Sequence, residues 1–347
     1  MSLEQTITSA WDRNSRWLVL LLPFAWLFSG LSALRRRYLQ NKFQGRSFSA
    51  PVVVVGNISV GGSGKTPLII ALVKALKQRG YSPGVVSRGY SGNATQYPLA
   101  VSPTTVVTES GDEPLLIATL ADCPVVVDRN RPAAVDYLLN HFNCDLVLSD
   151  DGLQHYALHR DIELIVVDGQ RGLGNHRRLP AGPLREGPQR LSQADLLVIN
   201  GLLEAEVSLA ADSVQKMNIQ PTAFRHLQSG RLESLDSWLD SQAGADKQVH
   251  AVAAIGNPQR FANTLSTMGL SVNLHSFDDH QTLSLEDLTF ADNLPVIVTA
   301  KDAIKLTGLD LNEEGIAAKI WILDIEAEID SALIDKLITK LQMLKAS

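Results

Sequence analysis

The stretch of sequence that most constrains the fold is 52–67, VVVVGNISVGGSGKTP. Its four consecutive valines predict a buried parallel strand, because a strand that is covered on both faces is apolar without alternation. Small residues follow, then Gly64-Lys65-Thr66 and a helical pattern from Leu68. A strand, a glycine-rich turn and a helix N-terminus together bind phosphate through backbone N–H groups and the helix dipole. The stretch therefore predicts a nucleoside-triphosphate site.

The predicted phosphate loop differs at one position from the usual spacing Gly-x-x-x-x-Gly-Lys-[Ser/Thr]. Ser59 stands where the first glycine is expected, and the pair Gly61-Gly62 partly offsets this difference. In such loops the lysine reaches the β- and γ-phosphates and the next hydroxyl binds Mg²⁺. A chance Gly-Lys-Thr at a surface turn is the alternative, which the flanking strand and helix disfavour. We expect nucleotide binding at Ser59, Val60, Gly61, Gly62, Ser63, Gly64, Lys65 and Thr66.

Length and composition are those of a globular protein with an ample core. The 347 residues are 45% hydrophobic and 20% charged, and the length allows two domains. A net charge of −6 does not favour nucleic acid as a partner. Cys123 and Cys144 show no metal-ligand spacing and lie beside apolar runs. We therefore expect buried free thiols and a reducing, cytosolic environment.

The segment 17–34 is apolar and uncharged, and Arg35-Arg36-Arg37 follow it directly. As a helix it would span about 27 Å, close to the ~30 Å of a bilayer core. The arginines argue against a signal peptide, whereas Pro23 and Gly30 leave a buried core helix open. We favour a membrane-inserted helix, spanning or re-entrant, whose basic flank holds the catalytic domain on the cytoplasmic face.

Two adjacent carboxylates follow the apolar strand pattern at 144–149. Downstream of a phosphate loop, this is where an aspartate that organises Mg²⁺ is expected. Asp150 and Asp151 repel each other unless a cation or hydrogen-bond donors lie between them. A charged turn before a helix is the alternative. Together with Lys65 and Thr66, the pair favours a magnesium site.

Arginines and a tyrosine follow two further predicted strands. Arg88 and Tyr90 come after the short strand at 82–87, and Arg129 and Arg131 come after the strand at 124–128. In open α/β sheets, ligands bind beyond the carboxyl ends of the strands. These side chains are candidates for substrate binding, with solvated loop residues as the alternative.

The basic loop 172–185 is too long to be a plain connector, and loops of this length are usually functional or disordered. Its arginines could meet an anionic acceptor or a lipid headgroup, although a solvated loop explains them equally well. The candidates in and beside this loop are Asn175, His176, Arg177, Arg178 and Arg185.

The expected fold class is α/β, with a P-loop NTPase-like parallel sheet domain, a second smaller α/β domain and an N-terminal membrane helix. We expect the membrane-associated helix and its basic flank over 1–45, and the P-loop domain over 46–215. A hinge or linker is expected over 216–249 and the smaller domain over 250–347. Local sequence alone explains Asp112 as the charge at a helix N-terminus and His280 as a surface residue.

Several of these stretches occur together, in this order, in one family. VGNISVGGSGKTP, SRGYSG, SGDEP, VVDRNR, SDDGLQH, LPAGPLRE, AIGNP and the Phe-x-x-His turn at 277–280 resemble tetraacyldisaccharide 4′-kinase, the lipid A 4′-kinase. The resemblance covers nearly the whole chain, and Ser59 belongs to the family's own pattern. It implies transfer of the ATP γ-phosphate to the 4′-hydroxyl of a tetraacylated glucosamine disaccharide 1-phosphate. It also implies Mg²⁺, association with the inner membrane, and two domains that close over the nucleotide.

The resemblance also implies roles for individual residues. Lys65 would bind the phosphates, and the metal would be held by Thr66 with the Asp150-Asp151 pair and Gln154. Asp112 would pair with His280 of the second domain to accept the proton of the acceptor's hydroxyl. Where the family often has Gly-Asn-Gly, His176 follows Asn175 here, so the roles of the loop's arginines are not carried over with the motif.

A membrane-bound nucleotide switch or ATPase is the alternative from another class. The guanine-specific pattern Asn/Thr-Lys-x-Asp is absent, since Thr299-Ala-Lys-Asp302 has the wrong spacing. A membrane-tethered scaffold with a degenerate loop is disfavoured because Lys65, Thr66 and both aspartates are intact. We expect a membrane surface as partner, and neither nucleic acid nor an obligate protein partner.

Overall fold

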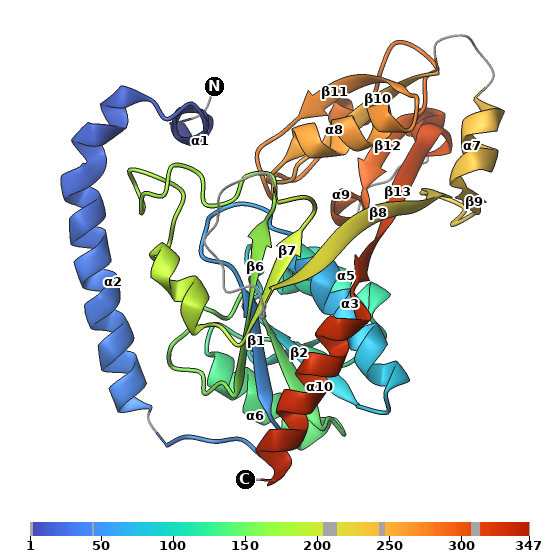
Figure 1. The fold of residues 1–347 in the computed structure, drawn as a ribbon. Helices are drawn as coiled ribbons and strands as arrows, with labels where there is room; N and C mark the ends of the chain where they lie inside the picture. The colour runs from blue at the N-terminus through green and yellow to red at the C-terminus, as the bar shows by residue number, and fades with distance from the viewer. Residues whose placement is uncertain (1–2, 44, 204–213, 243–246, 307–312, 347) are drawn as a thin grey trace.

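A single sheet runs through both lobes of the computed structural model (Figure 1). The structure describes residues 3–43, 45–203, 214–242, 247–306 and 313–346. In this part of the chain the sheet has 13 strands, in the order β11-β10-β12-β13-β8-β7-β6-β1-β5-β2-β4-β3, with β9 beside β8. The α/β class with a P-loop-type parallel sheet, predicted from sequence, is confirmed.

The larger lobe is built around β1 (Val52–Gly56), which is buried along its whole length. Its parallel neighbours are β5 (Leu146–Asp150) and β6 (Ile162–Asp168). The carboxyl ends of these strands therefore meet at one edge of the sheet, directly before the phosphate loop. The remaining strands of this lobe are β2 (Pro83–Ser87), β3 (Leu99–Val101), β4 (Val125–Val127) and β7 (Leu196–Asn200).

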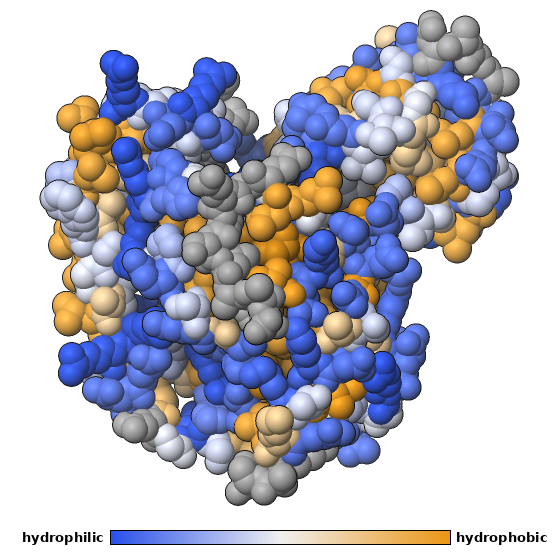
Figure 2. Space-filling model, viewed as in Figure 1, coloured by the Kyte–Doolittle hydropathy of each residue, from blue (hydrophilic) through white to orange (hydrophobic). Residues whose placement is uncertain are grey.

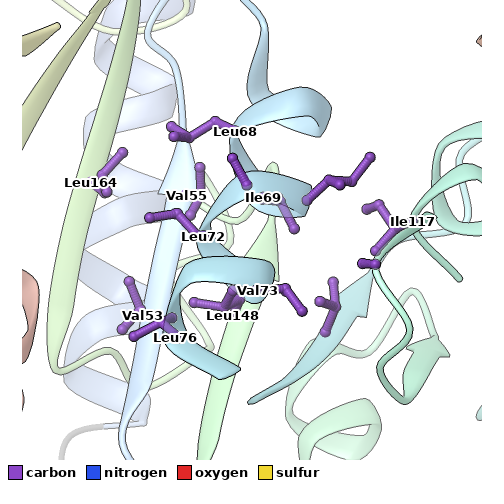
Figure 3. Packing of buried hydrophobic residues seen from close by; sticks show 14 of the residues in the cluster. Val53, Val55, Leu68, Ile69, Leu72, Val73, Leu76, Ile117, Leu148 and Leu164 are labelled. Carbon is purple, nitrogen blue, oxygen red and sulfur yellow. The ribbon is translucent and has the colours of Figure 1, made fainter. Parts of the chain in front are cut away.

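Helices cover both faces of this sheet, which is why the valines of β1 do not alternate with polar residues. Val53 and Val55 pack against α3 (Lys65–Gln78) on one face, as Figure 3 shows. Val52 and Val54 belong to a second cluster that includes α6 (Arg131–His141). The other helices of this lobe are α4 (Val107–Ser110), α5 (Asp112–Leu120) and the 3₁₀ helix η2 (Pro188–Gln193).

The smaller lobe has a core of its own around stacked aromatic rings. Phe224 and Trp238 are fully buried, and their ring centroids lie 3.9 Å apart. Its strands are β9 (Leu232–Ser234), β10 (Gln248–Ala253), β11 (Ser271–Ser276) and β12 (Val296–Thr299). Its helices are α7 (Leu235–Ser241), α8 (Pro258–Thr267), η4 (Glu286–Leu288), α9 (Ala300–Lys305) and η5 (Glu313–Lys319).

Two long antiparallel strands join the lobes. β8 (Val214–His226) pairs in parallel with β7, and it pairs along its length with β13 (Ile320–Ile329), which continues the sheet into β12. The linker expected over 216–249 is therefore largely paired strand and helix. Its partner β13 comes from about 100 residues downstream, a distance at which local composition carries no signal.

The C-terminal helix α10 (Ser331–Ala346) returns to the larger lobe, although the sequence predicted a smaller domain that continues to residue 347 (Figure 1). Leu333, Ile334, Leu337 and Leu341 of α10 share the hydrophobic cluster of β1 and α3. The apolar face of α10 is buried against α3 in this way, because a helix stripe of this kind needs a partner surface.

The N-terminal helices stand at the side of the larger lobe (Figure 1). They are α1 (Leu3–Asp12), the 3₁₀ helix η1 (Arg16–Leu21) and α2 (Leu22–Lys42). Residues 16–42 are helical, long and apolar enough to cross a membrane, and only 11% of their most apolar window is buried. The buried core helix that the sequence left open is therefore wrong, and hydrophobic side chains gather along this edge in Figure 2. Membrane insertion itself stays a prediction.

Both cysteines are free and partly buried, so the expectation of buried thiols is met only in part. Burial raises the pKa of the Cys123 thiol to about 12 and that of Cys144 to about 11. Both thiols therefore remain protonated and weakly reactive at neutral pH.

The packing of α10 predicts a stability effect in the larger lobe. Leu337→Ala removes a fully buried side chain and should lower the free energy of unfolding by about 3 kcal/mol. Met343→Ala on the same helix truncates a side chain that is 65% exposed, and should change it by at most about 0.5 kcal/mol. Urea denaturation in detergent measures both variants. Equal midpoints for the two would contradict the docking of α10.

Candidate active site

The phosphate loop connects β1 to α3, and two of its glycines have left-handed backbone angles. Gly61 has φ of +94° and Gly64 of +90°. A side chain at Gly64 would be strained by this backbone angle, and its Cβ atom would lie 2.5 Å from Asn200 Nδ2. Inside the loop, Asn57 Nδ2 donates to Ser63 Oγ over 3.1 Å. The Val60 N–H donates to the carbonyl of Pro183. The other backbone amides of the loop are therefore the candidates for phosphate binding.

Side chains from neighbouring strand ends hold the carbonyl groups of the loop. Asn200, at the end of β7, donates through Nδ2 to the Ser63 carbonyl over 3.1 Å. Arg171, in the loop after β6, donates to the Gly62 carbonyl over 2.6 Å. The shape of the loop is thus fixed by residues outside the motif.

Asp150 ends β5 and is buried next to the loop. Its Oδ2 accepts from Ser87 Oγ over 3.1 Å, whereas Oδ1 has no hydrogen-bond partner within the described part of the chain. Burial, with the nearby charges of Glu113 and Asp151, raises the pKa of Asp150 to about 7. A buried carboxylate oxygen without a hydrogen-bond partner is free to bind a cation, and oxygen donors are the ligands that Mg²⁺ prefers.

Asp151 follows in a left-handed conformation, with φ of +44°. Its carboxylate lies 3.5 Å from Lys65 Nζ and accepts from Arg185 Nη1 over 3.1 Å. Burial acts to raise the pKa of Asp151, but Lys65 and Arg185 outweigh it and lower the value to about 2. Lys65 and both predicted metal aspartates therefore lie together, as the sequence predicts for a magnesium site.

Gln154 forms hydrogen bonds with the start of the loop and with residues beside it. Its Nε2 donates to the Asn57 carbonyl over 3.0 Å and to Glu186 Oε1 over 2.8 Å. Its Oε1 accepts from Arg185 over 3.3 Å. The amide is fully engaged within the protein, and its predicted contact with a metal stays a prediction.

His280 and Asp112 meet across the two lobes, as the resemblance implies. Asp112 is the first residue of α5, and His280 lies in the turn after β11. His280 Nδ1 lies 2.9 Å and 3.1 Å from the two carboxylate oxygens. Burial acts to raise the pKa of Asp112, which is only 4% exposed, but the hydrogen bond from His280 and the charge of Lys301 lower it below its ordinary value.

Lys301 of α9 places a positive charge beside the pair of His280 and Asp112. Its Nζ lies 3.3 Å from both His280 Nε2 and Glu113 Oε1, and 3.4 Å from Asp279 Oδ1. Burial alone would lower its pKa, but Glu113, Asp112 and Asp279 raise it above the ordinary value. The ammonium group therefore stays charged and links α9 of the smaller lobe to α5 of the larger one.

The smaller lobe also contacts the phosphate loop and the strand-end residues next to it. Arg260 of α8 lies 3.2 Å from Asp168 Oδ2 and 3.3 Å from Asn200 Oδ1. A Cβ atom on Gly256 would lie 3.1 Å from the Gly62 backbone nitrogen. The turn between β10 and α8 is therefore packed directly on the loop.

One cavity of about 1270 Å³ joins these groups, and Figure 2 shows the molecule hollowed between its two lobes. The loop, both predicted metal aspartates and His280 line it, and residues of α2 form part of its wall. Of the predicted substrate-binding residues, Arg88, Tyr90, Arg129, Arg131 and Arg185 also line it.

Two of the predicted substrate residues differ sharply in their surroundings. Arg131 is buried, and its Nη2 donates to the Asp150 carbonyl. Its Nε and Nη1 have no partner among the described residues. Asn175 instead bonds within its own loop, to the Ala181 carbonyl and the Arg177 N–H, and it lies away from the cavity wall.

Sequence reasoning did not select several residues that shape the site. Asp168 and Asn200 each end an apolar strand, as Asp150 does, so the same strand-end signal could have found them. Lys301 follows β12 in the same way. Glu186 and Arg260 carried no local signal, because their roles depend on contacts with distant segments.

A glycine-rich loop between a central parallel strand and a helix, with carboxylates at the end of the next strand, defines this chain as a P-loop enzyme. A family profile described as tetraacyldisaccharide-1-P 4′-kinase, LpxK, matches residues 17–342. The chain belongs to this family of kinases.

Curated relatives named tetraacyldisaccharide 4′-kinase agree with this assignment. The protein from Hahella chejuensis is 40% identical over 98% of this chain and 97% of its own length. That from Alcanivorax borkumensis is 42% identical over 98% of each chain. The crystal structure of LpxK from Aquifex aeolicus in complex with ATP has a TM-score of 0.75 and 28% identity. It covers 93% of this chain and 99% of that one.

The contact of Arg260 with the strand ends predicts an effect on nucleotide affinity. Arg260→Gln removes the guanidinium that pairs with Asp168 and donates to Asn200, whose side chain holds the Ser63 carbonyl. The Kd for ATP should rise about tenfold, as expected for one lost charged hydrogen bond. Arg231→Gln, which removes an exposed arginine of the same lobe, should leave it unchanged. Calorimetric titration measures both, and equal affinities would contradict the proposed bracing.

Proposed function

We propose that this chain transfers the γ-phosphate of ATP to the 4′-hydroxyl of a tetraacylated glucosamine disaccharide 1-phosphate, at the cytoplasmic face of the inner membrane. Family membership and the ATP complex of the Aquifex relative support the reaction and the nucleotide. The observation that carries the proposal is the single cavity that holds the phosphate loop, two aspartates and a histidine–carboxylate pair from opposite lobes.

Phosphoryl transfer asks mainly for positioning and for neutralisation of charge. Lys65 would contact the β- and γ-phosphates, together with the amides of the loop. Thr66, Asp150 and Asp151 would hold Mg²⁺, with Gln154 beside them, and the unpartnered Oδ1 of Asp150 supports this assignment. When bound, the ion would neutralise developing charge on the phosphates.

His280 would accept the proton of the acceptor's hydroxyl. Asp112 holds the ring at Nδ1, and the Lys301 ammonium can only donate to Nε2. Both partners favour the neutral tautomer with its proton on Nδ1 and a lone pair on Nε2. A hydroxyl that takes the place of Lys301 at Nε2 would meet a ready base, and Asp112 would stabilise the imidazolium that forms.

The arginines of the cavity supply the charge that an anionic acceptor needs. Arg88, Arg129, Arg131 and Arg185 line its wall, and Tyr90 lies beside His280 with 4.9 Å between ring centroids. We assign these residues to acceptor binding. The Nε and Nη1 atoms of Arg131, which have no partner among the described residues, support this role, since a buried polar group without a partner is costly. Asn175 would act by shaping its loop.

Transfer of labelled γ-phosphate tests the proposal against a nucleotide switch or ATPase. Mg-ATP is supplied with and without tetraacyldisaccharide 1-phosphate in detergent micelles. Label in the lipid fraction supports the kinase. Formation of ADP without labelled lipid would contradict the kinase proposal and indicate an ATPase.

The proposed base predicts a selective loss of turnover. His280→Ala should lower the rate of transfer by about 10²–10⁴-fold, while the Kd for ATP stays near that of the wild type, because no phosphate contact is removed. His141→Ala removes an exposed histidine from α6 and serves as the control. Single-turnover kinetics and nucleotide titration separate the two effects. Unchanged turnover would remove His280 from the mechanism.

A further inference from the structure

The helix α2 touches the body of the protein through a charged side chain that leads toward the phosphate loop. We propose that Arg36 is a positioning residue, which holds Glu186 and through it the contacts that orient Lys65. The position of α2 against the larger lobe would then affect the rate of phosphoryl transfer. This inference rests on the proposed function for its kinetic part only.

Arg36 is anchored, unlike the arginines next to it. Its Nη1 lies 3.7 Å from Glu186 Oε2, and its Nη2 donates to Gln193 Oε1 over 3.3 Å. Its guanidinium carbon lies 5.0 Å from the centre of the Tyr156 ring, within the range of a cation–π interaction. Arg35 and Arg37 are exposed. Arg35 also lines the cavity, whereas the contacts with Glu186, Gln193 and Tyr156 are made by Arg36.

The position of Arg36 on the helix agrees with this role. Phe28, Ser32 and Arg36 all line the cavity that contains the phosphate loop, and their spacing of four residues places them on one face of a helix. Leucines at 27, 31 and 34 are exposed instead. One face of α2 thus looks into the site, while apolar side chains point away from the protein.

Glu186 gathers three further partners beside Arg36. It accepts from the Tyr156 hydroxyl and from Gln154 Nε2 over 2.8 Å. Arg190 Nε lies 3.4 Å from Glu186 Oε2 and forms an ion pair with it. The Glu186 side chain is only 12% exposed. Loss of Arg36 would leave this carboxylate with less compensation for its burial, and would change its hold on Gln154.

From Gln154 the contacts continue to the phosphate loop. Gln154 donates to the Asn57 carbonyl, where the loop begins, and accepts from Arg185. Arg185 donates to Asp151, which lies 3.5 Å from Lys65 Nζ. The network is contiguous from α2 to Lys65, and each link is a charged or buried polar contact of the kind that couples residues in double-mutant cycles.

Hydrogen–deuterium exchange in detergent micelles tests the structural part without any assay of activity. Arg36→Gln should speed exchange of the amides at 184–190, where the Arg185 N–H donates to the Ile58 carbonyl over 2.7 Å. Arg36→Lys, which keeps the charge, should restore part of the protection. Arg37→Gln removes an exposed arginine from the same helix and should leave exchange unchanged.

Kinetics of the same variants test the consequence. Arg36→Gln should lower the single-turnover rate at saturating acceptor by about five- to tenfold, and Arg37→Gln should not. A raised KM with unchanged rate and unchanged exchange would make Arg36 a headgroup contact and overturn the proposal. Identical exchange in Arg36→Gln and Arg37→Gln would overturn it as well. Absence of transfer in the wild type would instead refute the proposed function, and the exchange comparison would stand.

Discussion

The buried carboxylate of Asp112 is the point on which the site depends, because charged groups of the smaller lobe converge on it. His280 bonds to it directly, and Lys301 and Lys305 lie 3.7 Å and 3.9 Å away. A buried carboxylate without these partners would be strongly destabilising. Compensation of this charge therefore brings the smaller lobe over the phosphate loop, where the proposed proton acceptor and the nucleotide phosphates would meet.

The continuous sheet fixes the position of the two lobes relative to each other. β8 and β13 form a ribbon that belongs to both cores, and α10 returns to pack against α3. The lobes are thus joined by two paired strands. Motion of one lobe relative to the other would have to bend these strands. Arg260 and Gly256 then place the smaller lobe on the strand ends and on the loop itself. Residues of α2, Phe28 and Arg36 among them, line the same cavity as the loop.

Local patterns in the sequence predicted the parts of the site that follow strand ends. The valines of β1, the glycines at 61 and 64, and Asp150 are each dictated by burial, backbone angle or sheet edge, and these constraints act within a few residues. The pairing of Asp112 with His280 came only from the resemblance to the family. The partnership of β8 with β13, the return of α10, and the bracing by Arg260 and Glu186 depend on contacts between segments far apart. Periodicity and composition cannot encode such contacts.

We propose that Asp112 and His280 act as one unit across the two lobes. The most direct test is a double-mutant cycle on the single-turnover rate of phosphate transfer, with Asp112→Asn, His280→Gln and the combined variant. If the two residues work as a unit, the double variant will lose about as much activity as the more damaging single change, because groups that act together are not additive. Losses that multiply would show that the residues act independently and would contradict this account.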